Sequence, residues 1–427
     1  MHQRDVRLYW WGQTTSAFGT VLTAIAVPVI AIVSFHASAG QIGVVSAASS
    51  LPMLIFGLPA GALADRITRP RRTLIATDTL AALTLGLLAL GIVTGRANVG
   101  WLIALALIQG ALGALETLVY FTHLRQLVQG QDLVTARARL QVGGYGAGLI
   151  GRILAGPAIV LLGAAAALTT DAATYVISAL ALVCMRGSDV VERSDAAGGP
   201  AVLAALREAA TGLRFFATDR FGRFLLLFIV VPACAVAAVG TLTGPFLLRD
   251  LRLPTAAYGL VFALSGLTGL LGSLAAGRFL RPGPDPKLVV LTTFTAAIAC
   301  TLLLPLSAGP LPVAATCAAL GIALPIFFGA IANVALTSVF TTAVPEDTQG
   351  RAMAAIQVSA AGAGLLGALA AGALGDRIGV RAALWTVGTL AAGSLALGIV
   401  PALRAARPHA ASAAEPPSQP AVSKVNA

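Results

Sequence analysis

Four ionisable side chains lie well inside long apolar segments of this chain: Asp78, Glu116, Arg152 and Asp171. A charged side chain at the centre of a membrane-spanning helix costs at least about 2.5–3.5 kcal/mol. Charges that are kept there are expected to bind a proton, an ion or a polar group of a substrate. All four lie in the first half of the chain, so we expect any coupling chemistry in that half.

Glu116 belongs to a polar stripe on its predicted helix. Residues spaced four and three apart share one helical face, and here they are Gln109, Gly113, Glu116, Tyr120 and His123. The first apolar segment carries a matching stripe of Gln13, Ser16, Thr20 and Thr23. A buried carboxyl group in a low-dielectric cavity is suited to load a proton near neutral pH. The alternative is a carboxylate at the inner interface that reaches water and only fixes orientation.

Arg152 lies near the middle of the fifth apolar segment, on the same helical face as Gln141, Tyr145 and Gly148. We expect it to point inward as a positive partner for Glu116. The alternative is an ion pair that only closes the first group of helices, since structural ion pairs also perturb titration.

Asp78 and Asp171 are expected to contribute less to proton coupling. Asp78 lies about six residues into its segment, from where its side chain can snorkel to the cytoplasmic interface. Asp171 lies in the outer third of the sixth segment, beside Thr169 and Thr170.

The composition predicts that these residues lie in membrane-spanning helices. The chain has 427 residues, of which 57% are hydrophobic and 11% charged, and its mean hydropathy is +0.88. Windows of about 20 apolar residues, enough for a spanning helix, recur twelve times: about 10–34, 41–64, 73–94, 101–122, 140–163, 165–186, 224–247, 257–279, 287–307, 311–339, 352–374 and 383–401. These runs are continuously apolar rather than alternating, which excludes a β-barrel. The fold class predicted is an all-α membrane protein with twelve transmembrane helices.

The net charge of +11 follows the membrane topology. With the N-terminus inside, the outer loops hold Arg96, Arg249, Arg252, Arg377 and Arg381, and one span holds Arg152. The other 22 of the 28 Lys and Arg then lie on the cytoplasmic side, which is the positive-inside bias. We therefore expect a multi-pass protein of the inner (plasma) membrane with both termini cytoplasmic, in contact with the lipid bilayer and not with nucleic acid. The four cysteines show no metal-ligand spacing, so we expect no metal.

The longest loop divides the chain into two halves of six spans. We predict an N-terminal bundle at 1–186, a linker at 187–223, a C-terminal bundle at 224–401 and a disordered cytoplasmic tail at 402–427. Within the linker, residues 201–217 have the pattern of an amphipathic helix on the inner membrane face. The halves align at an offset of about 216 residues, so that 127–141 lies over 343–357 and Gly61 over Gly277.

The loop between the second and third spans carries a recognisable motif. Its residues Gly61, Leu63, Ala64, Asp65, Arg66 and Arg69 resemble the signature loop of the major facilitator superfamily, although Thr68 stands where a glycine is usual. The run 344–347 with Gly350 and Arg351, and the pair Gly156 and Pro157, resemble the branch of siderophore exporters and macrolide efflux pumps. Parallel six-helix repeats are the plan of that superfamily. The resemblance thus implies two pseudo-symmetric six-helix bundles.

The same resemblance implies roles for particular spans. Spans 1, 4, 7 and 10 would surround the substrate, with a cavity lined by Gln13, Thr20, Gln109, Tyr120, Tyr145, Phe228, Phe327, Phe328 and Asn333. Spans 2, 5, 8 and 11 would join the halves through small residues. A cytoplasmic gate would consist of Gly61, Asp65, Arg66, Arg69, Arg72 and Arg351, with the Asp65 carboxylate at the N-terminus of span 11.

These residues predict a secondary active transporter that exports an amphipathic or lipophilic small molecule (a drug, an antibiotic or a siderophore) in exchange for protons. Glu116 would carry the proton and Arg152 would tune it, with Asp78 and Asp171 as weaker candidates. Two alternatives remain: an uncoupled facilitator or importer, and a membrane sensor or scaffold that transports nothing. The chain shows no nucleophile–base pair, metal cluster or phosphate loop, so we expect neither an enzyme nor a cofactor. The fold usually works as a monomer, which we expect here.

Overall fold

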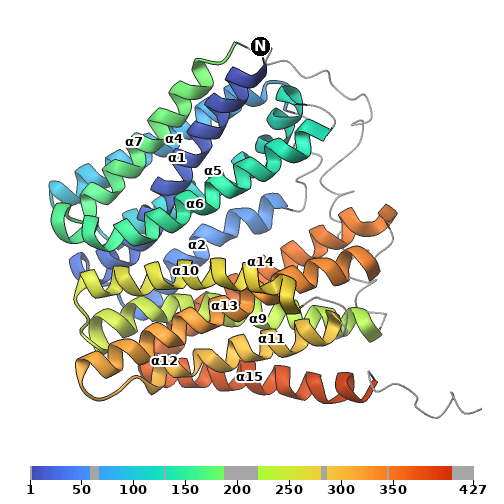
Figure 1. Ribbon diagram of the computed structural model, residues 1–427. Helices are drawn as coiled ribbons and strands as arrows, with labels where there is room; N and C mark the ends of the chain where they lie inside the picture. Colours follow the sequence, from blue (N-terminus) through green and yellow to red (C-terminus); the bar gives the residue numbers. More distant parts are fainter. Residues whose placement is uncertain are drawn as a thin grey trace, which may run out of the picture.

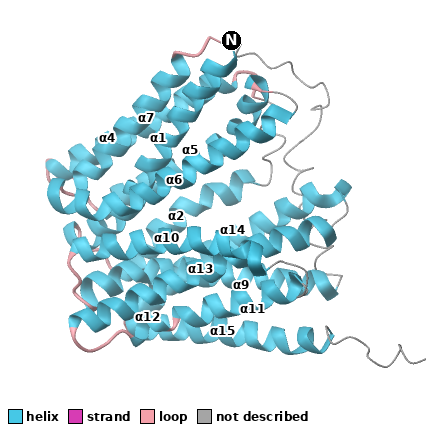
Figure 2. Ribbon diagram, viewed as in Figure 1, coloured by secondary structure: helices cyan, strands magenta, loops and turns pink. Residues whose placement is uncertain are grey.

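The computed structural model describes residues 2–57, 67–128, 131–186, 220–279, 286–343 and 346–405, and these ranges contain helices and no strand (Figure 2). Among the described residues, twelve helices are long and apolar enough to cross a membrane. The predicted fold class is therefore confirmed. The predicted amphipathic helix at 201–217 and the motif residues Gly61, Asp65 and Arg66 lie outside the described residues. Of the tail predicted at 402–427, residues 402–405 belong to the last helix and the rest lies outside the described residues.

The helices of the first half are α1 (His2–Val29), α2 (Ala39–Gly57), α4 (Pro70–Val93), α5 (Val99–Leu127), α6 (Gln131–Leu162) and α7 (Ala164–Val183). Those of the second half are α9 (Arg220–Pro245), α10 (Thr255–Phe279), α11 (Pro286–Thr301), the short α12 (Leu303–Leu306), α13 (Leu311–Ala343), α14 (Glu346–Ile378) and α15 (Val380–Ala405). Two π-helical segments, η1 (Ile30–Ser34) and η2 (Phe246–Asp250), continue α1 and α9.

The two halves repeat the same local backbone geometry at the offset seen in the sequence. The π-helical segments η1 and η2 begin 216 residues apart. Both are followed by a non-glycine residue at φ 51°, His36 in one half and Arg252 in the other. Gly163 and Gly379, also 216 apart, adopt φ 85° and 87° just after α6 and α14, in the left-handed region that favours glycine. The internal repeat is therefore structural as well as sequential.

Within the first half, α1 packs against α6 and α7, α4 against α5 and α7, and α2 against α5. In the second half α9 packs against α14, while α13 packs against α10 and α11. Between the halves, α2 lies along α14 and α6 lies along α10 (Figure 1). The expectation that spans 2, 5, 8 and 11 join the halves is confirmed.

Glycines bring the halves together at one end of the molecule. A Cβ on Gly43 of α2 would lie 2.7 Å from the Ala368 carbonyl oxygen and 3.2 Å from the Gly372 Cα of α14. A Cβ on Gly259 of α10 would collide with the backbone of Gly156 in α6. Gly43 and Gly259 are 216 apart, as are Gly156 and Gly372, so the two contacts are equivalent under the repeat.

This end of the molecule carries the loop between α1 and α2. The Ser38 hydroxyl there donates to Asp376 Oδ2 of α14 at 2.9 Å. From this end the two groups of helices diverge towards the end at which the chain begins (Figure 1). We refer below to the contacts at Gly43, Gly372, Gly156 and Gly259 as the glycine closure.

Close packing within the first half also depends on glycine, which gives a stability prediction. A Cβ on Gly110 of α5 would press on the backbone carbonyl group of Ser49 in α2, whereas a Cβ on Gly113 would meet nothing within 4 Å. Gly110→Ala is expected to destabilise the protein by about 1–3 kcal/mol through overpacking. Gly113→Ala on the same helix is expected to stabilise it by up to about 1 kcal/mol, because alanine is the better helix former. Thermal unfolding in detergent, followed by size-exclusion fluorescence, measures both changes; equal melting temperatures would contradict the close approach of Gly110 to Ser49.

Candidate functional site

The intramembrane acids of the first half lie on α4, α5 and α7, and of these helices α7 packs closely against α1. Two glycines let α1 approach α7 closely: a Cβ on Gly12 would be 3.3 Å from the Ser178 Cα, and one on Gly19 would collide with Asp171 and Thr174. Gly12 and Gly19 are seven residues apart, so they lie on one face of α1. This face places the polar stripe of α1 beside the acids.

Asp171 is 2% exposed and is held by its own helix. The Thr174 hydroxyl donates to Asp171 Oδ1 at 3.2 Å and to the Asp171 backbone oxygen at 2.7 Å. The side chain of Thr23 in α1 is within reach of the same carboxyl group. One turn further along α7, the Tyr175 hydroxyl lies 3.2 Å from Thr20 Oγ1. Asp171 thus lies at the contact between α7 and α1.

Asp78 of α4 is 1% exposed, and it does not reach an interface as expected. Neither of its carboxyl oxygens makes a hydrogen bond of normal geometry to a described residue, although Ser178 is close by. Glu116 of α5 lies within electrostatic range of Asp78. Two carboxyl groups therefore lie within electrostatic range of each other inside an apolar bundle.

Glu116 is at the centre of this group. The Gln13 side chain of α1 lies within reach of its carboxyl group, although Gln13 Nε2 makes no hydrogen bond of normal geometry to a described residue. Three tyrosines also lie within electrostatic range of Glu116, namely Tyr9, Tyr120 and Tyr175. We call Asp78, Glu116, Asp171 and these three tyrosines the acidic cluster.

Tyr9 closes one side of the acidic cluster. It is 1% exposed, and its hydroxyl donates to the Tyr120 carbonyl oxygen at 3.4 Å. Its ring is 5.5 Å from that of Tyr120 and meets the His123 ring edge-on at 5.2 Å. Neither Tyr9 nor Tyr175 was expected at the site from the sequence. Each lies four residues from a residue that was, Gln13 and Asp171 respectively, and this spacing places it on the same helical face.

The predicted pairing of Arg152 with Glu116 is not seen. The Arg152 side chain lies instead against α10 of the other half, where a Cβ on Gly266 would be 3.0 Å from its Cδ and 3.2 Å from Nη1. The reason is the register of α6: the turn that carries Arg152 faces α10, on the same side as Gly156, which packs on Gly259. Arg152 therefore lies at the contact between the halves.

Several residues predicted to line the cavity have other surroundings. The Gln109 amide donates to the Ala81 oxygen and to Thr84 Oγ1 of α4, both at 3.2 Å, and so joins two helices of the first half. Phe228 is fully buried in the apolar core of the second half, and Phe327 packs against the same core. Helical periodicity shows which residues share a face of a helix, but not which element that face packs against. These residues were therefore assigned to the cavity although they contact other helices.

Other predicted residues remain accessible. Tyr145 is 72% exposed on α6, and Asn333 is exposed on α13 with its amide donating to Gly329 of its own helix at 3.1 Å. The Phe328 ring, which meets that of Phe327 edge-on at 5.4 Å, is half-buried. Arg69 and Arg72 are exposed around the start of α4, and Arg351 lies in the second turn of α14. Among the described residues no group of His, Cys, Asp and Glu is arranged to hold a metal ion.

Comparison with known proteins gives one consistent result. Residues 9–339 match the family described as the Major Facilitator Superfamily. The multidrug efflux pump Tap of Mycolicibacterium fortuitum is 29% identical over 401 residues, which cover 90% of this chain and 92% of that protein.

Solved structures share the fold at lower identity. The nucleoside transporter NupG matches with a TM-score of 0.72 at 15% identity, over 93% of this chain and 98% of that one. A bacterial homologue of the human lysosomal transporter Spinster, in an inward-facing and unoccupied conformation, matches with a TM-score of 0.63 at 16% identity, over 94% and 98%. The family match covers well over half of the chain, and the twelve spans and their repeat agree with it. The chain belongs to the major facilitator superfamily.

Proposed function

We propose that this transporter exports an amphipathic or lipophilic small molecule by alternating access, in exchange for protons. The observation that carries the proposal is the acidic cluster, in which Asp78 and Glu116 lie within electrostatic range of each other inside an apolar bundle. Ionisable residues inside a bundle of spanning helices mark proton or substrate pathways. The similarity to a multidrug efflux pump supports export over import.

Glu116 is the proposed proton carrier, because it is the member of the cluster within range of Asp78 and of all three tyrosines. Asp78 is the proposed second site, since neither of its oxygens is hydrogen-bonded within the described structure. Asp171, which is held by Thr174, would transmit changes in the cluster to α7. Gln13 of α1 is within reach of Glu116, and Thr20 of α1 contacts Tyr175 of α7, so a proton on Glu116 can bias the position of α1.

Orientation follows from the distribution of positive charge. With both termini cytoplasmic, the glycine closure lies at the outer end and the halves diverge towards the cytoplasm. An exporter takes up its cargo from that side. The Asp65 loop, with Arg66, Arg69, Arg72 and Arg351, would form the inner gate of the opposite state, the Asp65 carboxylate meeting the positive end of α14. The exposed Tyr145 and Asn333, with the half-buried Phe328, suit an amphipathic cargo better than a sugar.

Everted membrane vesicles test the proposal directly. The pH gradient across vesicles that contain the protein is monitored while lipophilic dyes, macrolides and siderophores are added one at a time. We expect at least one compound to dissipate the gradient, and vesicles without the protein to show no response. Movement of a compound with no change in the gradient would establish an uncoupled facilitator instead. Saturable binding of a compound without any movement would favour the sensor alternative.

A further inference from the structure

A groove of about 1390 Å³ runs between α1 and α6, on a side of α1 that the proposed mechanism does not use. Its lining from α1 includes Arg7, Trp10, Thr14 and Phe18, spaced three or four residues apart. At 100° per residue this stripe lies well away from the face that carries Tyr9, Gln13 and Thr20. The groove is therefore separate from the acidic cluster.

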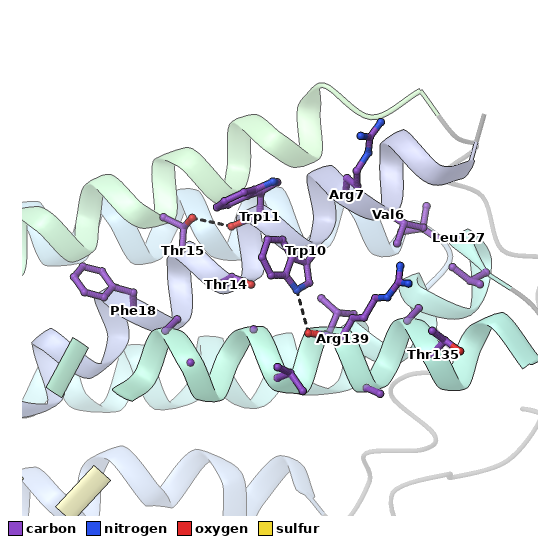
Figure 3. Close-up of a pocket in the computed structure, with 18 of the residues that line it drawn as sticks. Val6, Arg7, Trp10, Trp11, Thr14, Thr15, Phe18, Leu127, Thr135 and Arg139 are labelled. Atoms are coloured by element: carbon purple, nitrogen blue, oxygen red, sulfur yellow. Dashed lines mark hydrogen bonds between the residues drawn. The ribbon is translucent and has the colours of Figure 1, made fainter. Parts of the chain in front are cut away.

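The groove is formed by close contact of the two helices at a glycine. A Cβ on Gly143 of α6 would lie 2.6 Å from Thr14 Oγ1 and 2.7 Å from Trp10 Nε1. Trp10 Nε1 donates to the Arg139 carbonyl oxygen at 3.0 Å, which fixes the indole across the space between the helices (Figure 3). Beyond this contact the α6 wall is small or apolar, with Gly146, Ala147 and Ile150.

The charge and the length of this groove indicate the kind of molecule that it can bind. Its described lining contains two arginines, Arg7 and Arg139, both exposed, and no acidic side chain. Both lie towards the end at which the chain begins, with Phe18 towards the other end (Figure 3). From Arg7 to Phe18, and from Arg139 to Ile150, the helices rise about 16 Å over eleven residues. One leaflet of the hydrocarbon core is about 15 Å thick.

Two tryptophans, Trp10 and Trp11, lie along the groove between its arginines and its apolar end. This is the level at which the headgroup of a bound lipid would join its acyl chains. Trp10 and Trp11 pack edge-on at 4.8 Å, and Trp11 is 61% exposed. Tryptophan is enriched at the membrane–water interface, and basic pockets between spanning helices bind anionic headgroups. We infer that the α1–α6 groove is a binding site for an anionic glycerophospholipid, with the phosphate at Arg7 and Arg139 and an acyl chain lying along the groove to Phe18 and Ile150.

Native mass spectrometry of the purified full-length protein tests this site. Phosphatidylglycerol and phosphatidylcholine with identical acyl chains are titrated separately, so that only the headgroup charge differs. We expect tighter binding of phosphatidylglycerol, weakened about five-fold by Arg7→Gln or Arg139→Gln and about 25-fold by both, at roughly 1 kcal/mol for each charge. Arg186→Gln, an exposed arginine after α7 and outside the groove, is the matched control and is expected to change nothing.

A second variant fills the groove without altering its charge. Gly146 lines the groove and a Cβ on it would meet nothing within 4 Å, so the indole of Gly146→Trp is expected to occupy the groove and displace the lipid while the melting temperature is kept. Equal affinity for the two lipids, or binding that survives both Gly146→Trp and the double arginine variant, would overturn the inference. So would a lipophilic dye that displaces phosphatidylglycerol from the native protein and that no longer binds to Gly146→Trp, since the groove would then be a cargo site. Binding is measured without transport, so these outcomes are independent of the proposed export.

Discussion

Glu116→Gln is expected to abolish proton movement in response to substrate, down to the level of vesicles that lack the protein. Glutamine keeps the shape of the side chain and can still meet the Gln13 amide, but it cannot carry a proton at neutral pH. The loss should extend to export driven by an imposed pH gradient. The reason is that Glu116 lies within electrostatic range of Asp78, Tyr9 and Tyr175, so its protonation affects the whole cluster. The measurement is the pH-gradient assay in everted vesicles, with a compound that the native protein exports.

Two isosteric changes serve as matched comparisons for Glu116→Gln. Asp78→Asn is expected to impair coupling strongly, because the Asp78 carboxyl group is within electrostatic range of Glu116 and lacks hydrogen bonds of its own within the described structure. Asp171→Asn is expected to have a smaller effect, because Thr174 can donate to an amide oxygen as it does to the carboxylate. If Glu116→Gln retains coupling while Asp78→Asn loses it, the proton carrier is Asp78 and the assignment of Glu116 is wrong.

Substrate binding separates a coupling defect from a folding defect. Glu116→Gln should still bind the compound and unfold at close to the native temperature, since the side chain volume is unchanged. A variant that neither binds nor folds would say nothing about protons. The double variant Asp78→Asn with Glu116→Gln removes both carboxyl groups. If these groups repel each other in the native protein, the melting temperature of the double variant should be no lower than that of either single variant.

Most of the fold was predictable because a bilayer imposes it. Spanning helices need about 20 apolar residues, and each of the twelve predicted segments overlaps a helix of the structure. The offset of 216 also holds locally, at the π-helical ends of the first span of each half and at Gly163 and Gly379. Gly43 and Gly259 were not singled out as contacts between the halves, although the same offset relates them to each other. Comparing glycine positions across the repeat would have found them.

The site was predictable only in part, since helical spacing defines a face but not the partner of that face. The stripes of α1 and α5 do lie together, with Gln13 beside Glu116. Arg152 was predicted to pair with Glu116, yet it lies on the face of α6 that packs against α10. Gln109 shares the stripe of Glu116, but its long amide reaches α4. Asp78 was expected to reach water, whereas it is buried within electrostatic range of Glu116.

The glycine closure gives the other large expected effect, a shift between the two states of the transport cycle. Gly43→Val and Gly259→Val each insert a branched side chain where the opposing backbone leaves no room. Overpacking of this kind costs about 1–3 kcal/mol, and it is felt only while the outer end is closed. Each variant should therefore reduce the population of the outward-closed state, relative to the outward-open state, by a factor of about 5 to 150.

Hydrogen–deuterium exchange of the purified protein measures this shift. The loops at 35–38 and 251–254, next to the two contacts, should exchange faster in both variants. Gly240→Val is the control. Gly240 lies in the last turns of α9, at the same end of the molecule as the glycine closure, and a Cβ there meets nothing within 4 Å. The two contacts are separate, so the effects of Gly43→Val and Gly259→Val should add when they are combined. Unchanged exchange in both variants, with stability retained, would mean that the halves part elsewhere and that the glycine closure does not gate the outer end.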